Sequence, residues 1–520
     1  MADMLTVLEN CRISPPPATV TEQSLPLTFF DMMWLPFFPI NQTNNSSNVS
    51  RKPEIRYVEG DSLVVSFAEG DLDFDDLVGN HPRACDMFHP LVPRLERATY
   101  VSDHLIIPLF SVQVTLFPNK GISVGLTNRH VLCDASTRFD FLKAWTFIFK
   151  HGTDELFLAS GSLPFYDRAI KYPGSLDEIY LNHPEIESIG ENYQPPHLGS
   201  CPDKVRATFV LTREQINRLK KWVSIQKPTL EYISSFSVAC GFVWSCIAKS
   251  SAEVGEKKGE DDLERFICVV DWRTRLNPPV PQIYFGNCVG VCETAKTKSI
   301  ILSGSKGFLT ALELIGKAIS ETVKNRDGML KDAETWMDRG FDPMPTLSVA
   351  GTPKIKIYDT EFGWGRPKKY ETISIDHNGS ISVNACAESP KDIEIGLSLP
   401  AKQMDAKGFL TALELIGKAI SETVKNRDGM LKDVETWMDR GFDPMPTLSV
   451  AGTPKIKIYD TDFGWERPKK YETISIDHNG SISVNACAES PEDIEIGLSF
   501  PAKQMDAFIS ISRNELQKMC

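Results

Sequence analysis

The chain has 520 residues, of which 42% are hydrophobic and 24% charged, and its formal net charge at pH 7 is −13. A chain of this length is too long to fold around one ordinary hydrophobic core, so two or more domains are expected. The excess of acidic residues argues against nucleic acid as a partner. No apolar run reaches the roughly 18–20 residues of a membrane-spanning helix, so no membrane partner is expected. The N-terminus lacks the features of a secretory signal, and the 12 cysteines include no CxxC pair. We therefore expect a cytosolic protein with reduced thiols and no metal site.

Strands and helices alternate irregularly in the part of the chain before residue 306. The apolar patterns predict strands at 62–67, 105–117 and 207–211. Thr212 and Gln215 form a capping box before a helix with one apolar face, and Ser235–Ala248 is predicted as a buried helix. We expect an α/β protein with a site between two mixed-sheet domains. The predicted boundaries are 1–195 for the N-terminal domain, 196–205 for a crossover linker and 206–406 for the C-terminal domain.

A long internal repeat follows. Residues 306–406 recur as residues 407–507, an offset of 101 positions (407 − 306). The copies differ only at Ala333/Val434, Glu361/Asp462, Gly365/Glu466, Lys391/Glu492 and Leu399/Phe500. Solenoid repeats are shorter and more numerous, so this pattern is typical of a recent duplication or of an error in assembling the sequence. If one copy completes a sheet, the other has no vacant place in that fold. Residues 508–520 are predicted as a C-terminal helix.

Each copy carries its own secondary-structure pattern. In the first copy, an amphipathic helix is predicted around 309–324, and strand-like runs occupy 354–358 and 380–384. The sequence DHNG at 376–379 is a hairpin-turn signal between runs with alternating apolar residues.

One histidine among the nine stands in a context that favours chemistry. His130 follows the strand-like run 122–126, and Asp134 comes four residues later. A histidine has an unperturbed pKa of about 6.5, which suits a general base for an acceptor hydroxyl. Asp134 could anchor the loop from behind. The spacing by itself equally fits a hydrogen-bonded structural histidine.

A competing pattern lies just upstream. Residues 121–125 (GISVG) match the GxSxG elbow of serine hydrolases, which would indicate an esterase. That elbow needs a strand, a sharp turn and a helix, whereas Ser123 lies inside a continuous strand-like run. We therefore favour His130 over Ser123 as the reactive group.

Five segments, in order along nearly the whole chain, resemble those of the BAHD acyltransferases of plants, in particular the anthocyanin and flavonoid glucoside malonyltransferase branch. They are LPLTFFD with WL at 25–35, the HxxxD segment at 127–136, VDWRTR with two prolines at 270–279, YFGNC at 284–288, and the DFGWG-like sequences EFGWG at 361–365 and DFGWE at 462–466. Together the five motifs are far more specific than any one of them.

The resemblance implies a fold like that of chloramphenicol acetyltransferase, with an active-site channel between two domains. It implies that His130 is the general base and that Asp134 orients the loop by pairing with an arginine, either Arg273 or Arg275. The hydroxyl then attacks the thioester directly, with no acyl-enzyme, bound cofactor or metal. The segment with Phe362, Gly363, Trp364 and Gly365 is expected to be structural, with its Trp filling a core.

The branch also implies the substrates: malonyl-CoA and a sugar hydroxyl of a phenolic or flavonoid glucoside. Arg168 is the candidate for the malonyl carboxylate, because a planar guanidinium binds a carboxylate in bidentate fashion. The alternative is a surface arginine paired with Asp167 or another acid. Thr28, Asp31 and Trp34 are candidates for the acceptor channel. A monomer is expected. Acetyl-CoA or hydroxycinnamoyl-CoA as donor, or a catalytically impaired relative, are the alternative functions.

Two departures from the family affect these expectations. Relatives carry a longer stretch where this chain has only a polar run near 39–51, which indicates a deletion that would expose apolar surface. The second departure is the duplication. Glu361 follows His130 by 231 residues (361 − 130), the separation expected for the family, and the first copy keeps Gly365. We therefore expect the first copy to complete the fold.

Overall fold

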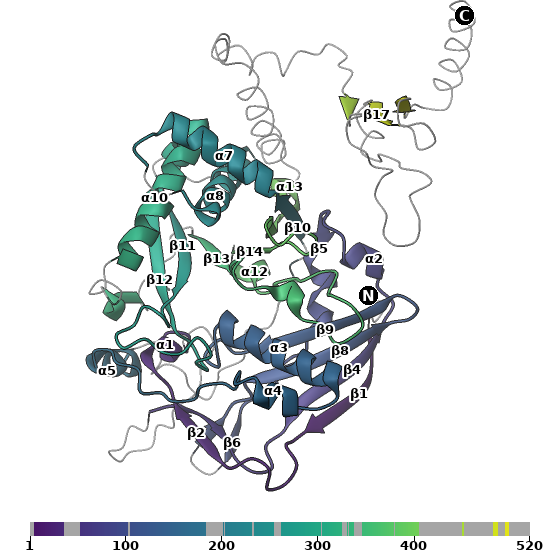
Figure 1. Ribbon diagram of the computed structural model, residues 1–520, viewed down its shortest axis with the longest axis vertical. Helices are drawn as coiled ribbons and strands as arrows, with labels where there is room; N and C mark the ends of the chain where they lie inside the picture. Colours follow the sequence, from purple (N-terminus) through teal and green to yellow (C-terminus); the bar gives the residue numbers. More distant parts are fainter. Residues whose placement is uncertain are drawn as a thin grey trace, which may run out of the picture. The chain divides into compact units, whose positions relative to one another are not determined.

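The structure is a computed structural model (Figure 1) that describes residues 5–35, 52–101, 104–183, 201, 203–230, 233–253, 262–302, 304–324, 330, 332–336, 346–378, 380–404, 450–451, 482–486 and 494–498. Residues 1–427 and 428–520 form two compact units. Within the described ranges, no helix is long and apolar enough to cross a bilayer. The predicted deletion near 39–51, most of the linker and the C-terminal helix at 508–520 lie outside them.

A four-stranded mixed sheet forms early in the first unit. It consists of β1 (Leu5–Ile13), β4 (Leu63–Gly70), β8 (Phe110–Phe117) and β9 (Gly121–Asn128), in the order β1-β4-β8-β9. The pair β4–β8 is parallel, and the other two pairs are antiparallel. Helix α3 (Ala135–His151) packs against this sheet, where Phe141 meets Phe110 of β8 edge to face at 5.4 Å.

Short elements complete this part of the chain. Strands β2 (Gln23–Pro26) and β3 (Glu54–Tyr57) pair, as do β6 (Thr99–Val101) and β7 (His104–Ile106). The short helices are α1 (Phe29–Met32), α2 (Phe74–Leu77), α4 (Glu155–Ala159) and α5 (Ser175–Leu181), with 3-10 turns at η1 (Cys85–Met87) and η2 (His89–Leu91).

A seven-stranded mixed sheet is the second large sheet of the first unit. Its order is β12 (Val289–Thr297), β11 (Leu263–Asp271), β13 (Thr346–Ala350), β14 (Ile381–Ala385), β15 (Ile393–Pro400), β10 (Lys204–Leu211) and β5 (Arg83–Ala84). Strand β5 comes from the early part of the chain and pairs with β10, which ties the two halves together. The predicted α/β class with two mixed sheets is confirmed. Because β10 begins at Lys204, the end of the predicted linker is strand.

Three long helices cover one face of this sheet: α7 (Arg213–Gln226), α8 (Ser235–Glu253) and α10 (Gly304–Lys324) (Figure 1). The predicted capping box of α7 is present, because Thr212 and Gln215 bond each other's backbone reciprocally. The apolar sides of these helices and of the strands form the largest core cluster of the described residues. Shorter helices lie at α9 (Lys298–Leu302), α12 (Ile375–Asn378) and α13 (Ala401–Met404), and 3-10 turns at η3 (Ala333–Thr335) and η4 (Ile357–Asp359).

Two predictions in the first copy are wrong. The run 354–358 is not a strand, because its backbone turns and enters η4. The DHNG signal does not make a hairpin, since residues 375–378 form α12. There Asp376 is fully buried and accepts a hydrogen bond from Nε2 of His89 at 3.0 Å. This tertiary contact outweighs the local turn preference.

The first copy of the repeat supplies three adjacent strands of the seven-stranded sheet. Strands β13, β14 and β15 lie between β11 on one side and β10 on the other. Ala333, one of the five differing positions, is fully buried, and its carbonyl accepts a hydrogen bond from the Tyr180 hydroxyl at 2.7 Å. Gly365 has φ +102°, a backbone conformation that side chains other than glycine rarely adopt.

The second unit repeats part of this arrangement. Its described strands are β16 (Val450–Ala451), β17 (Ile482–Ala486) and β18 (Ile494–Leu498), in the order β16-β17-β18. Val450 pairs with Ile482, and Ser483 with Gly497. These are the pairs Val349–Ile381 and Ser382–Gly396 of the first copy, each shifted by 101. The duplicated strands therefore keep both the directions and the register of the original.

Candidate active site

His130 lies in a short loop between β9 and α3. The loop is fixed at its start, because the Arg129 amide donates to the Leu109 carbonyl at 2.9 Å and the Arg129 side chain is buried. The Leu132 amide then donates to the Arg129 carbonyl at 3.0 Å, which folds the chain back across His130. Val131, next to it, is fully buried. The backbone on both sides of the histidine is thus held by the core.

Asp134 closes the loop and starts α3. Its Oδ1 caps the helix by accepting from the Thr137 amide at 3.1 Å, and its Oδ2 accepts from the Cys288 amide at 3.1 Å. Arg273 donates to both oxygens, from Nη1 at 2.8 Å and from Nη2 at 3.0 Å. Every acceptor direction of the carboxylate is therefore used inside the protein. These contacts are consistent with the predicted role of Asp134 in orienting the loop.

Of the two arginines that the sequence left open, Arg273 makes this pair. It is fully buried, and its Nη2 also donates to the carbonyls of Tyr284 and Gly286, each at 3.1 Å. Arg275 lies two residues on and donates to the Asp271 carbonyl instead. The electrostatic effect of Asp134 and Asp271 keeps the Arg273 guanidinium charged despite its burial, since both raise its pKa.

The imidazole of His130 lies in an environment that keeps it neutral. Burial, followed by the positive charge of Arg138, lowers its pKa from 6.5 to about 4, against the opposing effect of Asp134. Its Nδ1 is buried, whereas the residue as a whole is partly exposed. The indole of Trp34 stacks on the ring with centroids 3.6 Å apart and an interplanar angle of 21°. A neutral imidazole has one nitrogen with a free lone pair, which can accept a proton from a hydroxyl.

Arg168, the candidate for the donor carboxylate, reaches the same region from the loop after α4. Its Nη1 donates to Asp31 Oδ2 at 3.0 Å and to the Tyr284 hydroxyl at 2.8 Å. Its Nε and Nη2 are buried and have no hydrogen-bond partner among the described residues. The predicted alternative was a surface pair with Asp167 or another acid. Arg168 does pair with another acid, Asp31, but not at the surface, since its side chain is only 7% exposed. Asp167 instead accepts from the Ala169 amide.

Gly286 makes room for this arginine. It has φ +126°, and a Cβ there would lie 2.4 Å from Arg168 Nη1. The YFGNC segment thus binds both arginines. The Tyr284 hydroxyl accepts from Arg168, for which Gly286 leaves space, and the carbonyls of Tyr284 and Gly286 accept from Arg273. The sequence motif pointed to this segment, but nothing in it identified Tyr284 or Asn287 as contacts of the site.

The three predicted acceptor-channel residues have different surroundings. Thr28 and Asp31 are buried and form the capping box of α1, so the expectation that they line an open channel does not fit the structure. Apolar neighbours enclose them, because the LTFF sequence places three large side chains into the surrounding core. Trp34 is partly exposed and stacks on His130. It stays a candidate contact for an acceptor.

The segment 361–365 packs on the far part of α3. Phe362 meets Trp145 edge to face at 5.0 Å, and Glu361 pairs with Lys150 at 3.0 Å. The expectation that its Trp fills a core is wrong, because Trp364 is 67% exposed, stacked on Phe362 and edge to face with Phe149 at the surface. The segment thus contacts the helix that Asp134 caps, without approaching His130 itself.

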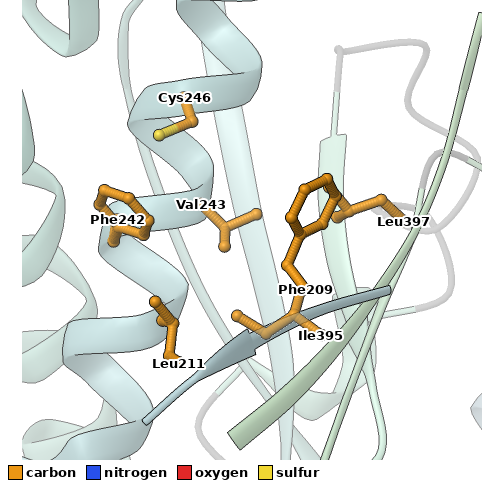
Figure 2. Close-up of a pocket in the computed structure, with 7 residues that line it drawn as sticks. All are labelled: Phe209, Leu211, Phe242, Val243, Cys246, Ile395 and Leu397. Atoms are coloured by element: carbon orange, nitrogen blue, oxygen red, sulfur yellow. The ribbon is translucent and has the colours of Figure 1, made fainter. Parts of the chain in front are cut away.

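Two further features are excluded as sites. Ser123 lies inside β9 and is paired with Thr115 of β8, so the turn that a nucleophile elbow needs is not formed. A pocket of about 10 Å³ lies between α8 and the strands β10 and β15 (Figure 2), a volume that holds at most one water. Its lining is wholly apolar, and it contains none of the candidate residues. We interpret it as a packing gap in the core.

Comparisons with known proteins place this arrangement in a family. The model of the Transferase family matches residues 60–409. Over 446 residues the chain is 47% identical to malonyl-coenzyme A:anthocyanin 3-O-glucoside-6''-O-malonyltransferase of Dahlia pinnata, covering 78% of this chain and 96% of that one. It is 38% identical to phenolic glucoside malonyltransferase 1 of Nicotiana tabacum, covering 73% and 92%. The fold is similar to the crystal structure of vinorine synthase, with a TM-score of 0.54 at 16% identity, covering 77% of this chain and 96% of that one.

Proposed function

This chain belongs to the Transferase family and is an acyltransferase, and on that premise we propose that it transfers a malonyl group from malonyl-CoA to a sugar hydroxyl of a phenolic or flavonoid glucoside. The observation that carries the proposal is the guanidinium of Arg168, whose Nε and Nη2 are buried without a partner in the described part of the site. An unpaired buried donor pair is costly unless a ligand occupies it.

The chemistry follows from the state of His130. Its buried Nδ1 is out of reach of an acceptor, so Nε2 takes the proton of the attacking hydroxyl. The oxygen forms a bond to the thioester carbonyl carbon, and the tetrahedral intermediate then breaks the C–S bond. The His130 imidazolium returns its proton to the departing thiolate, giving the malonyl ester and free coenzyme A. No covalent enzyme intermediate is required.

Asp134 and Arg273 serve this step as positioning residues. Because Arg273 and backbone amides satisfy the carboxylate completely, the start of α3 is fixed and the loop with His130 is fixed with it. A general base must lie within hydrogen-bond reach of the proton that it abstracts, so the loop geometry bears directly on rate. Trp34 adds a second restraint through its stacking on the ring.

The donor is assigned from the shape of the Arg168 guanidinium. Its Nε–H and Nη2–H point the same way, which is the fork that binds a carboxylate through two parallel hydrogen bonds. Malonyl-CoA carries a free carboxylate, whereas acetyl-CoA and coumaroyl-CoA do not. The names of the Dahlia and tobacco relatives agree with a malonyl donor. A coumaroyltransferase of Arabidopsis thaliana is also similar, at 32% identity over 77% of this chain, so another acyl donor is the alternative.

We further propose that the enzyme acts in the cytosol as a monomer. All ten cysteines of the described residues are unbridged, and eight of them are buried. Unbridged thiols are typical of a reducing compartment.

A donor comparison tests the assignment. Purified protein is incubated with malonyl-CoA, acetyl-CoA or coumaroyl-CoA and a set of flavonoid glucosides, and the product mass is measured. Arg168→Ala is expected to lower kcat/KM for malonyl-CoA by about 100-fold, as loss of a charge-assisted bidentate contact of roughly 3 kcal/mol would. Arg218→Ala, at an exposed pair with Glu214, is the matched control. Folded protein that transfers no acyl group from any donor would refute the proposal.

A further inference from the structure

Asp31 receives more hydrogen bonds than the cap of a one-turn helix needs. Its Oδ2 accepts from the Thr28 amide and hydroxyl, each at 2.9 Å, and from Arg168 Nη1 at 3.0 Å. Its Oδ1 accepts from the backbone amide of Asn287 at 3.0 Å and from the side-chain Nδ2 at 3.1 Å. The side chain is 0% exposed. The buried carboxylate of Asp31 therefore connects Arg168, the proposed contact of the malonyl group, to the YFGNC segment beside His130.

On the donor side, Asp31 fixes the direction of the Arg168 fork. The guanidinium is planar, so holding Nη1 between Asp31 and the Tyr284 hydroxyl sets the plane in which Nε and Nη2 lie. Gly286 lets the group approach the backbone closely. Without the carboxylate, Arg168 would keep only the neutral Tyr284 contact, and a buried guanidinium with one neutral partner would reorient or leave the site.

On the side of the base, Asp31 fixes the direction of the Asn287 amide. Nδ2 donates to Asp31 Oδ1 and to the His130 carbonyl at 2.9 Å, and a carboxylate and a carbonyl can only accept. The amide oxygen must then point to the opposite side. Both this oxygen and His130 Nδ1 are buried and without a hydrogen-bond partner among the described residues. The two groups belong to neighbouring segments, since Asn287 Nδ2 donates to the carbonyl of His130 itself.

We propose that Asp31 is a positioning residue that couples donor recognition to the catalytic base: Oδ2 aims the Arg168 fork at the malonyl carboxylate, and Oδ1 orients Asn287 so that its amide oxygen holds the Nδ1–H of His130. The proton on Nδ1 leaves Nε2 free to accept the proton of the hydroxyl. The donor half of this inference rests on the proposed function, and the Asn287 half requires only that His130 is the base.

The test compares three variants with malonyl-CoA and acetyl-CoA as donors. Arg168→Ala is expected to lower the ratio of kcat/KM for malonyl-CoA to that for acetyl-CoA. Asn287→Ala is expected to lower kcat with both donors by about 10–100-fold, because it removes a charge-assisted hydrogen bond to the imidazolium that forms during the reaction. Asp31→Asn keeps the shape of the side chain but loses its charge, and it should show both effects together.

Controls separate this role from a structural one. Thr28→Val removes one donor to Asp31 at the α1 cap and should lower the urea midpoint without changing the donor ratio. A lower midpoint for Asp31→Asn with wild-type kcat and donor ratio would overturn the inference.

If Asp31→Asn does not fold, a double-mutant cycle between Arg168→Ala and Asn287→Ala tests the coupling instead. Non-additive effects on kcat/KM support the coupling, and additive effects contradict it. Wild-type protein that makes no malonyl ester contradicts the proposed function instead, and the kcat of Asn287→Ala with acetyl-CoA still tests the link to His130.

Discussion

Arg273 and Asp134 form a bidentate ion pair in the interior, 139 residues apart in sequence, with N–O distances of 2.8 and 3.0 Å. The pair joins the loop that carries His130 to the turn after β11. Since the same Arg273 also binds two carbonyls of the YFGNC segment, three stretches of chain converge on one guanidinium. The position of His130 therefore depends on an ion pair that is buried in the interior.

Arg273→Ala is expected to lower the free energy of unfolding by roughly 3–5 kcal/mol, because it leaves the Asp134 carboxylate buried without its counter-charge. Urea unfolding followed by tryptophan fluorescence measures this. Arg275→Ala is the matched control, since Arg275 donates only to the Asp271 carbonyl and is partly exposed. Equal losses for the two variants would contradict the assignment of Arg273 as the partner.

The acid limb of the kcat/KM profile is expected well below pH 6.5. This profile reports the free enzyme, in which burial lowers the pKa of His130 to about 4. The base is then neutral, and the enzyme active, down to about pH 5. Steady-state assays from pH 4.5 to 8 with malonyl-CoA check this, with protein stability verified at each pH. Half-maximal kcat/KM at pH 6.5 or above would show that burial does not lower the pKa of His130.

Stability should depend on pH through the same histidine. The unfolded chain binds a proton near pH 6.5, whereas the folded protein binds it only near pH 4. Between these values the unfolded state holds more protons, so stability falls as pH falls, by about 3 kcal/mol in all. His130→Gln removes this contribution, and its unfolding free energy should vary less between pH 6.5 and 4.5 than that of wild type. Parallel curves for the two proteins would count against the neutral, buried imidazole.

The two copies of the repeat should differ in how well they complete the fold. A chain without residues 407–507 is expected to keep activity and stability close to those of the full chain, because β13, β14 and β15 already pair with β10 and β11. A chain without residues 306–406 would place Val434 at the buried Ala333 position and Glu466 at the position where φ is +102°. Overpacking and backbone strain should together cost roughly 2–4 kcal/mol.

Urea unfolding and malonyl transfer by the two deletion proteins measure this difference. Gly365→Glu in the chain without residues 407–507 isolates the backbone part, of about 1 kcal/mol or more. Lys391→Glu, at an exposed position, is its control and should have little effect. Greater stability of the protein that keeps only the second copy would refute the view that the first copy completes the sheet.

The sequence predicted local elements well where local chemistry determines them. Helix α7 has both its capping box and its apolar face, and β10 has the expected run of apolar residues. The prediction failed at 376–379, where the burial of Asp376 against His89 and Arg206 decides the conformation. It failed again at Trp364, since a DFGWG-like sequence says nothing about which side of the segment faces α3.

The long-range contacts of the active site could not be predicted from the sequence either. HxxxD and YFGNC located His130, Asp134 and Gly286 in the sequence. The choice between Arg273 and Arg275 could not be made, because the direction of each side chain depends on the turn that follows β11. The contact of Asp31 with Arg168 spans 137 residues and arises only when α1 packs beside the YFGNC segment. Nothing local to either residue carries that information.

Replacement of His130 tests the central claim most directly. Wild type, His130→Ala and the control His151→Ala, which changes an exposed histidine at the end of α3, are assayed for ester formation from malonyl-CoA and the best glucoside acceptor. Circular dichroism confirms that all three are folded. We predict that His130→Ala lowers kcat by about 10²–10⁴-fold, the usual contribution of a general base, and that His151→Ala does not. Transfer by folded His130→Ala at the wild-type rate would contradict the account.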